Sequence, residues 1–376
     1  KAWGRSGDTG ALAALQMSFW DIPGVKAGVV TGDAAWGVLK YAKENNFAIP
    51  AFNCTSTSTV NSVLEAGKEL GRPVMIQFSE VGSAFFAGKS LPNEKGVFQA
   101  SILGAVVGAH YVRNVAPAYG IPVFVHSDRC ARKQLPWFDG MLEADEAFFK
   151  AHAEPLFSSH MLALSEESDE ENIAICAKYL TRMAPMNLIL ETEIGITGGA
   201  EDGVDSSGAM KERLFSTPED VYKVWQGLSP ISEKFTVAPA FGNGHGLHRA
   251  GPVVLQPDLL GKFQAYLAQK LGGDTKPYFF VFHGGSGSEK RDIATALSNG
   301  VVKMTVDTDA QWAYWEGLLN FYKSKEGYLQ GQIGNPEGPE KPNKSYYDPR
   351  KWVRESELSM VRRVKESCTD LNNLNK

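Results

Sequence analysis

Residues 188–193 read LILETE, an apolar, strand-like run that ends in the carboxylate Glu193. Two later runs have the same form, and they are VAPAFGNGH at 237–245, which ends in His245, and FFVFH at 279–283, which ends in His283. A carboxylate and two imidazoles on separate strand ends can converge on one divalent cation. These segments indicate a sheet whose strand ends carry a metal site.

A fourth run, VFVHSDR at 123–129, ends in a different combination of side chains. Asp128 is followed directly by Arg129. A guanidinium has no lone pair to donate, so Arg129 cannot join the other side chains as a ligand. Its fixed positive charge would also repel a divalent cation beside it.

Eight strand-like runs alternate with helix-like segments along the chain. The runs are nearly continuously apolar, which is typical of parallel strands buried on both faces. One intervening segment shows the helical pattern clearly, because Ser168 and Glu171 form a capping box ahead of apolar residues at helical spacing. The predicted strands are 47–53, 73–79, 122–128, 156–161, 186–194, 235–242, 278–284 and 301–307.

Eight such units predict a (β/α)8 barrel. A doubly wound open sheet is the alternative, but it would usually have a Gly-rich turn after its first strand, and residues 53–57 (NCTST) do not form one. We expect a single barrel domain over residues 1–376, with an N-terminal extension at 1–30 and a C-terminal extension of helices and loops at 310–376. Within the latter, the Pro/Gly-rich stretch 334–343 is expected to dock, because aromatic residues follow it closely.

Composition excludes several classes of protein. The chain has 376 residues and a net charge of −5, which gives no support for nucleic-acid binding. It lacks an apolar run of about 18 residues, so we expect no membrane span, and residues 1–30 do not have the pattern of a secretory signal. The four cysteines show no metal-binding spacing, which favours reduced thiols in a cytosol-like compartment.

Polar residues stand where the other predicted strands end, and a barrel places its active site at the C-terminal ends of its strands. They include Asn53, Ser79 and Asp307. Small residues at 284–288 (GGSGS) expose backbone amides that can cradle a phosphate, together with residues 307–309 after the last strand. The loop 197–203 (TGGAEDG) predicts a mobile segment that delivers Glu201 as a general base.

The chain resembles the class II, metal-dependent fructose-1,6-bisphosphate aldolases, in particular their longer type A branch. The resemblance covers about residue 32 to the C-terminus. The motifs that carry it are PWFDG at 136–140, PLFSSHM at 155–161, GITGG at 195–199, GNPEGPEKPNK at 334–344 and DPR at 348–350.

The resemblance implies reversible cleavage of fructose-1,6-bisphosphate into dihydroxyacetone phosphate and glyceraldehyde 3-phosphate. Zinc would act as a Lewis acid, and a monovalent cation is a further candidate cofactor. The resemblance also implies a homodimer in the cytoplasm or the plastid stroma. By motif, the zinc ligands are Glu193, His245 and His283.

The same resemblance assigns roles to other residues of the chain. Asp128 handles the C4 hydroxyl proton, and Glu201 moves the C3 proton of dihydroxyacetone phosphate. Asn53 and Ser79 position the substrate, and Arg350 binds the distal phosphate and can come from the partner subunit. The ketose-phosphate site comprises Gly246, Gly284, Ser286, Asp307 and Thr308.

The chain departs from the family pattern at the catalytic centre. Arg129 stands where the family has its fourth zinc ligand, Ala200 replaces a loop glutamate, Thr305 replaces an asparagine, and Glu80 enters a turn that is usually neutral. Two interpretations follow. The chain is either a working aldolase with weakened or altered metal binding, or a non-catalytic relative that serves as a structural or sugar-phosphate-binding subunit.

A lysine Schiff-base aldolase is disfavoured, because the run 235–242 ends without a lysine. We also expect the Arg129 guanidinium to lie within ion-pair reach of Glu193 or Asp128, since an uncompensated buried charge is costly.

Overall fold

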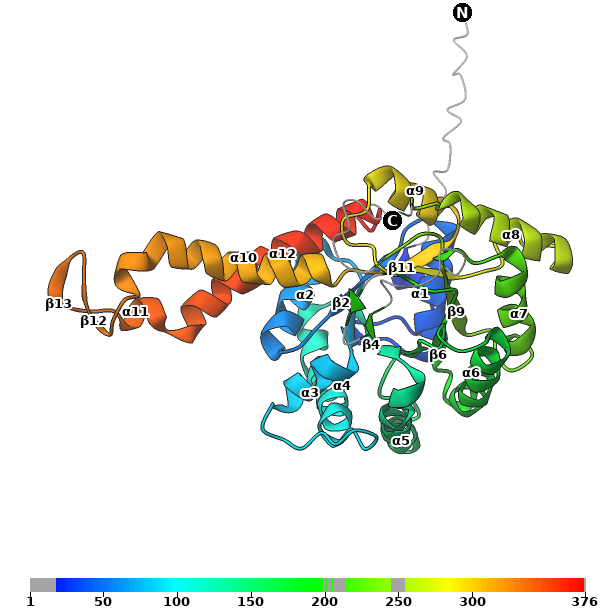
Figure 1. Cartoon of the computed structure of the whole chain (residues 1–376), viewed down its shortest axis with the longest axis horizontal. Coiled ribbons are helices and arrows are strands. Elements are labelled where there is room, and N and C mark those ends of the chain that lie inside the picture. The colour runs from blue at the N-terminus through cyan, green and yellow to red at the C-terminus, as the bar shows by residue number, and fades with distance from the viewer. Residues whose placement is uncertain (1–17, 199, 202–203, 206–213, 245–253, 375–376) are drawn as a thin grey trace, which may run out of the picture.

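Eight parallel strands close into a barrel (Figure 1). The computed structural model describes residues 18–198, 200–201, 204–205, 214–244 and 254–374. Each strand pairs in parallel with the next along the chain, and the last pairs with the first, so the sheet closes. The barrel strands are β2 (Ile49–Asn53), β3 (Val74–Phe78), β4 (Pro122–Cys130), β5 (Ser159–Leu162), β6 (Ile189–Ile194), β9 (Phe235–Pro239), β10 (Phe280–Phe282) and β11 (Val301–Thr305).

This confirms the predicted barrel, and closure excludes the open-sheet alternative. Each predicted run overlaps one barrel strand, and β4 and β5 extend past the predicted ends at 128 and 161. The helices between the strands are α2 (Thr57–Leu70), α3 (Glu80–Ala87), α4 (Gln99–Tyr119), α5 (Leu135–His152), α6 (Asp169–Met183), α7 (Pro218–Leu228), α8 (Asp258–Leu271) and α9 (Lys290–Ser298). Short 3-10 turns occur at Phe19–Asp21, Arg132–Gln134, Ala184–Met186 and Glu326–Tyr328.

Local sequence explains where α6 begins and which face it buries. The Ser168 hydroxyl accepts a hydrogen bond from the Glu171 amide at 3.2 Å, and acidic residues fill the first turn. Cys176, Leu180 and Met183 are buried on the face that meets the barrel. The predicted helix start is therefore confirmed at the Ser168 cap.

The N-terminal end of the barrel is closed by α1 (Gly32–Glu44). Its Leu39 packs in one cluster with Met75, Phe124 and Ile189 of three barrel strands. Just before it, β1 (Gly28–Val29) pairs with the start of β4, so part of the expected N-terminal extension adds a strand to the sheet. Apolar packing therefore closes this end of the barrel.

The segment after β11 forms an arm, defined here as α10 (Thr308–Lys325), the hairpin of β12 (Ile333–Asn335) and β13 (Gly338–Pro342), α11 (Lys344–Tyr347) and α12 (Pro349–Asp370). The arm projects from the barrel, and α12 returns to pack against α2 (Figure 1). The stretch 334–343 is ordered by its own contacts at the arm tip. There the buried Asn343 donates to the carbonyls of Gly331 and Gly334 at 2.8 and 2.9 Å.

Within the described ranges, no helix is long and apolar enough to cross a membrane. The four cysteines, Cys54, Cys130, Cys176 and Cys368, are buried and free. Burial raises the pKa of the Cys176 thiol to about 12, so this thiol stays protonated at neutral pH.

The crossing of α10 and α12 generates a test of the arm. A Cβ added at Gly317 would lie 2.4 Å from the Glu355 carbonyl oxygen. Gly→Ala usually stabilises a helix, but here we expect Gly317→Ala to lower the free energy of unfolding by about 1–3 kcal/mol through overpacking. Urea unfolding measures this change. The exposed Ser324→Ala on the same helix is the control and should be nearly neutral; a stabilised Gly317→Ala protein would contradict the close crossing.

Candidate active site

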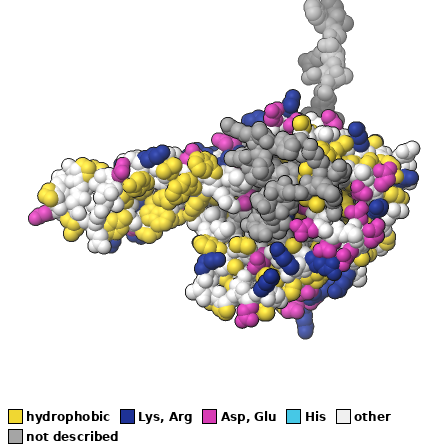
Figure 2. All heavy atoms as spheres, viewed as in Figure 1, with side chains coloured by type: hydrophobic (Ala, Val, Ile, Leu, Met, Phe, Trp, Pro, Cys, Tyr) yellow, Lys and Arg dark blue, Asp and Glu magenta, His cyan; other side chains and the backbone are white. Residues whose placement is uncertain are grey.

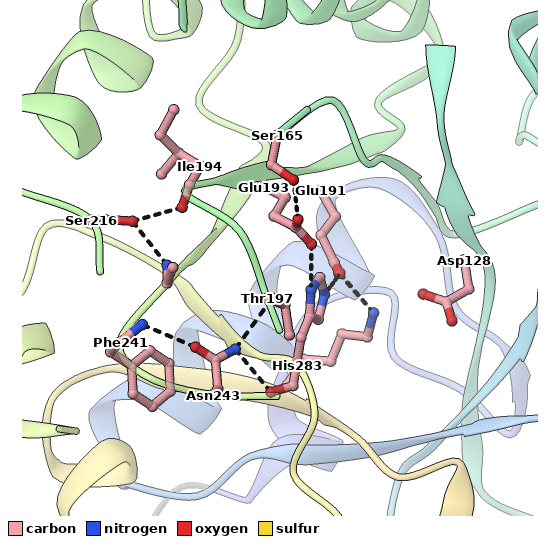
Figure 3. Close-up of polar contacts among 12 residues, drawn as sticks. Asp128, Ser165, Glu191, Glu193, Ile194, Thr197, Ser216, Phe241, Asn243 and His283 are labelled. Carbon is pink, nitrogen blue, oxygen red and sulfur yellow. Dashed lines mark hydrogen bonds and ion pairs between the residues drawn. The ribbon is translucent and has the colours of Figure 1, made fainter. Parts of the chain in front are cut away.

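The polar ends of the barrel strands meet at one rim. Figure 3 shows Asp128, Glu193 and His283 facing the same space from β4, β6 and the end of β10. All three side chains are nearly fully buried. The ends of these three strands therefore bring polar side chains to one rim of the barrel.

Glu193 and His283 form the centre of this cluster. The Glu193 Oε2 atom lies 3.1 Å from His283 Nδ1, and its Oε1 accepts a hydrogen bond from the Ser165 hydroxyl. Burial alone would raise the pKa of Glu193, but the His283 hydrogen bond and the charge of Arg129 lower it to about 2. Glu193 is therefore a carboxylate at neutral pH, and Ser165 fixes its orientation.

A second carboxylate contacts the other nitrogen of the His283 ring. His283 Nε2 lies 2.8 Å from Glu191 Oε1. Burial would lower the pKa of His283, but its hydrogen bonds to Glu191 and Glu193 raise it to about 9. Each ring nitrogen of His283 therefore faces its own carboxylate, Nε2 that of Glu191 and Nδ1 that of Glu193.

Glu191 is in turn held by a buried lysine that the sequence reasoning did not identify. Lys303 Nζ lies 2.8 and 3.0 Å from the two Glu191 oxygens and 3.1 Å from His126 Nε2. A signal for Glu191 was present, because it precedes Glu193 by two residues and so lies on the same face of the strand. The pairing of Lys303 with Glu191 could not be predicted from the local sequence, because the two residues are far apart in the chain.

The opposite side of the rim holds Asp128. Its Oδ2 accepts hydrogen bonds from Asn53 Nδ2 and Gln77 Nε2, both at 3.0 Å, and Gln77 also donates to the Asn53 oxygen. Gln77 is a further site residue that sequence reasoning missed, although it precedes Ser79 by two positions on the inward face of β3. The two amides keep the Asp128 carboxylate in a fixed orientation.

Two other residues near β3 have structural partners. The Ser79 hydroxyl accepts from the Gly82 amide at 3.2 Å and so caps α3. Glu80, one of the departures from the family, accepts from Asn93 at 3.1 Å and from the Ser101 hydroxyl. The Glu80 carboxylate therefore fastens the loop before α4.

Arg129 lies at an irregularity of β4. The pairing of β4 with β5 shifts register between Ser127 and Cys130, and Arg129 has a left-handed backbone with φ of 49°. The residue is only 8% exposed, and its charge lowers the pKa of Glu193. The positive charge of Arg129 therefore stabilises the ionised form of Glu193, a predicted metal ligand. That Arg129 forms an ion pair with Glu193 or Asp128 stays a prediction.

The predicted phosphate segments lie side by side. Ser286 Oγ accepts a hydrogen bond from the Asp309 amide at 3.4 Å, in the first turn of α10, which begins at Thr308 with Asp307 as its N-cap. Gly284 has φ of 64°, and a Cβ there would lie 2.2 Å from the Gly244 carbonyl oxygen. Only glycine fits this close approach. The contact of Ser286 with Asp309 places the loop 284–288 beside the N-terminus of α10.

Among the described site residues, Arg350 is not brought to the rim. Arg350 lies at the start of α12 on the arm, where its side chain is 87% exposed and pairs with Asp348 at 2.7 Å. The backbone of Glu201 forms β7 (Ala200–Glu201), which pairs with β8 (Val204–Asp205). His245 and Gly246 lie outside the described residues.

The described residues supply two of the ligand atoms that a divalent cation would need. Glu193 Oε2 and His283 Nδ1 face each other, while Ser165 and Glu191 hold the remaining polar atoms of the two side chains. Among the described residues, three His, Cys, Asp or Glu side chains do not converge on one metal position.

Comparisons with known proteins agree with this geometry. The family described as "Fructose-bisphosphate aldolase class-II" matches residues 34–376. The fructose-bisphosphate aldolase of Neurospora crassa is 54% identical over 357 residues, covering 95% of this chain and 99% of that protein. The class 2 enzyme of Escherichia coli K12 is 51% identical over 350 residues, covering 93% and 97%.

A solved structure shows the same likeness in three dimensions. The crystal structure of the fructose-bisphosphate aldolase from Campylobacter jejuni has a TM-score of 0.87 and 49% identity, and the match covers 96% of this chain and all of that one. The chain therefore belongs to the class-II fructose-bisphosphate aldolase family.

Proposed function

We propose that this protein catalyses the reversible aldol cleavage of fructose-1,6-bisphosphate to dihydroxyacetone phosphate and glyceraldehyde 3-phosphate. The observation that carries the proposal is the pairing of Glu193 Oε2 with His283 Nδ1 at 3.1 Å, on the same rim as Asp128. Relatives that are about half identical carry the name of this enzyme, which favours the catalytic interpretation over the non-catalytic one.

Glu193, His283 and His245 would hold a zinc ion, with Arg129 at the altered fourth position. A bound zinc ion supplies a Lewis acid that polarises the substrate ketone. Asp128 takes the proton of the C4 hydroxyl when the carbon–carbon bond breaks. Asn53 and Gln77 aim its carboxylate by holding Oδ2. A monovalent cation remains a further proposed cofactor.

The other substrate groups are assigned to the rest of the rim. Glu201 moves the C3 proton of dihydroxyacetone phosphate. Gly284, Ser286, Asp307 and Thr308, together with Gly246, bind the ketose phosphate through the loop 284–288 and the start of α10. Ser79 helps to position the substrate through the turn that it caps.

Two buried polar atoms support binding of a polyhydroxylated ligand. Gln77 Oε1 and Thr305 Oγ1 have no hydrogen-bond partner within the described part of the chain. Thr305 follows Lys303 by two positions on β11, so both lie on the interior face. Buried polar atoms normally have partners, and sugar hydroxyls would supply them.

A homodimer is supported by the exposed apolar surface of the arm. Trp312 and Trp315 on α10 are 54% and 51% exposed, and Figure 2 shows hydrophobic side chains along the arm. A second apolar patch, at Phe85, Leu103 and Val107, lies on α3 and α4. We propose that a second copy covers these patches and that Arg350 then binds the distal phosphate in the partner's site.

The free, buried cysteines support a reducing compartment, either the cytoplasm or the plastid stroma.

Arg129→His tests the altered ligand position. The substitution supplies a neutral nitrogen donor and removes a repelling charge, so zinc affinity should rise roughly tenfold or more, and cleavage of fructose-1,6-bisphosphate should rise with it. Chelator competition and an aldol-cleavage assay on the same sample measure both. Arg132→His is the matched control, because Arg132 is half-exposed and pairs with Glu167. Stoichiometric, tightly held zinc in the unmodified protein would show that Arg129 does not obstruct the site.

Gly284→Ala tests the phosphate site. Backbone amides bind phosphate without a metal ion, so the unmodified protein should bind dihydroxyacetone phosphate with or without a chelator. Gly284→Ala should abolish this binding, because its Cβ would collide with the Gly244 backbone. Gly272→Ala controls for backbone strain alone, since Gly272 has a similar φ of 69° but open space around it. Absence of binding by the unmodified protein under both conditions would contradict the site.

Trp312→Glu combined with Trp315→Glu tests the dimer. Burying two charges in an apolar interface is unfavourable, so a dimer of the unmodified protein should become a monomer. Analytical ultracentrifugation at micromolar concentration measures the mass. Leu271→Glu on α8, which is 42% exposed and far from the arm, should leave the dimer intact. A monomeric unmodified protein would rule out the dimer.

A further inference from the structure

A chain of three hydrogen-bonded side chains leads from the floor of the barrel to the rim. Lys303 Nζ contacts both oxygens of Glu191, and Glu191 Oε1 also accepts from His283 Nε2 at 2.8 Å. All three residues are at most 2% exposed. One oxygen of Glu191 therefore serves the lysine and the histidine at the same time.

The three donors of the Lys303 ammonium are all used. Two go to the oxygens of Glu191 and one to His126 Nε2, at 3.1 Å. His126 is fixed on its other side by Ser159 Oγ, which lies 2.8 Å from Nδ1. The ammonium cannot shift without breaking one of these contacts, so the Glu191 carboxylate is held in one orientation.

We propose that Lys303 is a positioning residue that acts through Glu191 to hold the His283 ring with Nδ1 facing Glu193. This inference rests on the proposed metal-dependent function, because Nδ1 is the atom that would bind the metal ion. Glu191 accepts a hydrogen bond from the Nε2–H group, which fixes the orientation of the ring. Lys303 balances the buried charge of Glu191 so that the acceptor can remain ionised there.

The alternative role for a buried lysine in an aldolase is attack on a substrate carbonyl. The cavity beside Lys303 and Glu191, which Leu39, Met75 and Phe124 also line, has a volume of about 10 Å³. This space suits about one water molecule and excludes a sugar phosphate. Lys303 is therefore placed to support other side chains and not to contact the substrate.

Two double variants separate positioning from structural stability. Lys303→Met with Glu191→Gln removes both charges but keeps an oxygen that can accept from His283 Nε2. Lys303→Met with Glu191→Met also removes both charges but leaves no acceptor, and such an apolar replacement of a buried ion pair is compatible with folding. Lys234→Met is the control, because Lys234 is also a buried lysine but bonds to Asn187 outside this network.

The measurements are zinc and cobalt affinity by chelator competition, the cobalt absorption spectrum, and proton NMR of the His283 Nε2–H in the metal-free protein. We expect the Gln double variant to bind metal about 10- to 100-fold more tightly than the Met double variant. The hydrogen-bonded Nε2 proton should persist in the former and disappear in the latter. Lys303→Met alone should bind metal weakly, and Lys234→Met should match the unmodified protein.

Equal metal affinity and equal NMR signals in the two double variants would overturn the inference. Failure of the Gln double variant to fold, while Lys234→Met folds, would also overturn it, because the pair would then be indispensable to the fold. A different result bears on the proposed function. If the unmodified protein binds neither metal, that function fails. The NMR comparison of the two double variants still decides whether Glu191 orients His283, and the spectrum of Lys303→Met alone decides whether Lys303 is needed for this.

Discussion

The balance of buried charge inside the barrel is the constraint on which the site depends. Glu191 and Glu193 are almost fully buried on neighbouring inward positions of β6, and two like charges in a low-dielectric interior repel each other strongly. The structure offsets them with Lys303 below, His283 between and the charge of Arg129 acting on Glu193 from β4. Each cationic group therefore influences where a metal ion can bind.

Arg129 and a metal ion would both stabilise the same carboxylate. Because Arg129 already lowers the pKa of Glu193, a divalent cation would have to bind in the presence of that charge. The left-handed backbone of Arg129 at the β4 irregularity sets the direction from which the side chain leaves the strand.

The arm is held in shape by its own contacts and not by the barrel sheet. Its helices cross closely at Gly317, and its tip is ordered by Asn343, so it keeps its shape while it projects from the barrel. An ordered projection that exposes two tryptophans is suited to contact with another surface. The helix α12 begins at the arm tip and ends against the barrel. It therefore connects Arg350 with Arg363, which pairs with Asp309 beside the loop 284–288 at 2.7 Å.

The sequence by itself determined the barrel, because strands buried on both faces must be apolar throughout and eight such runs alternate with helical segments. It also determined the polar strand ends, since Asp128, Glu193 and His283 each lie at the end of a strand-like run that begins with apolar residues. Only the tertiary structure decided which of these groups support one another. Lys303 and Glu191 are 112 residues apart, and Gln77 and Asp128 are 51 apart, so barrel closure and strand register alone bring them into contact. For the same reason the sequence could not show that Arg350 lies on a projecting arm, because the direction in which α10 leaves the barrel depends on its packing against α12.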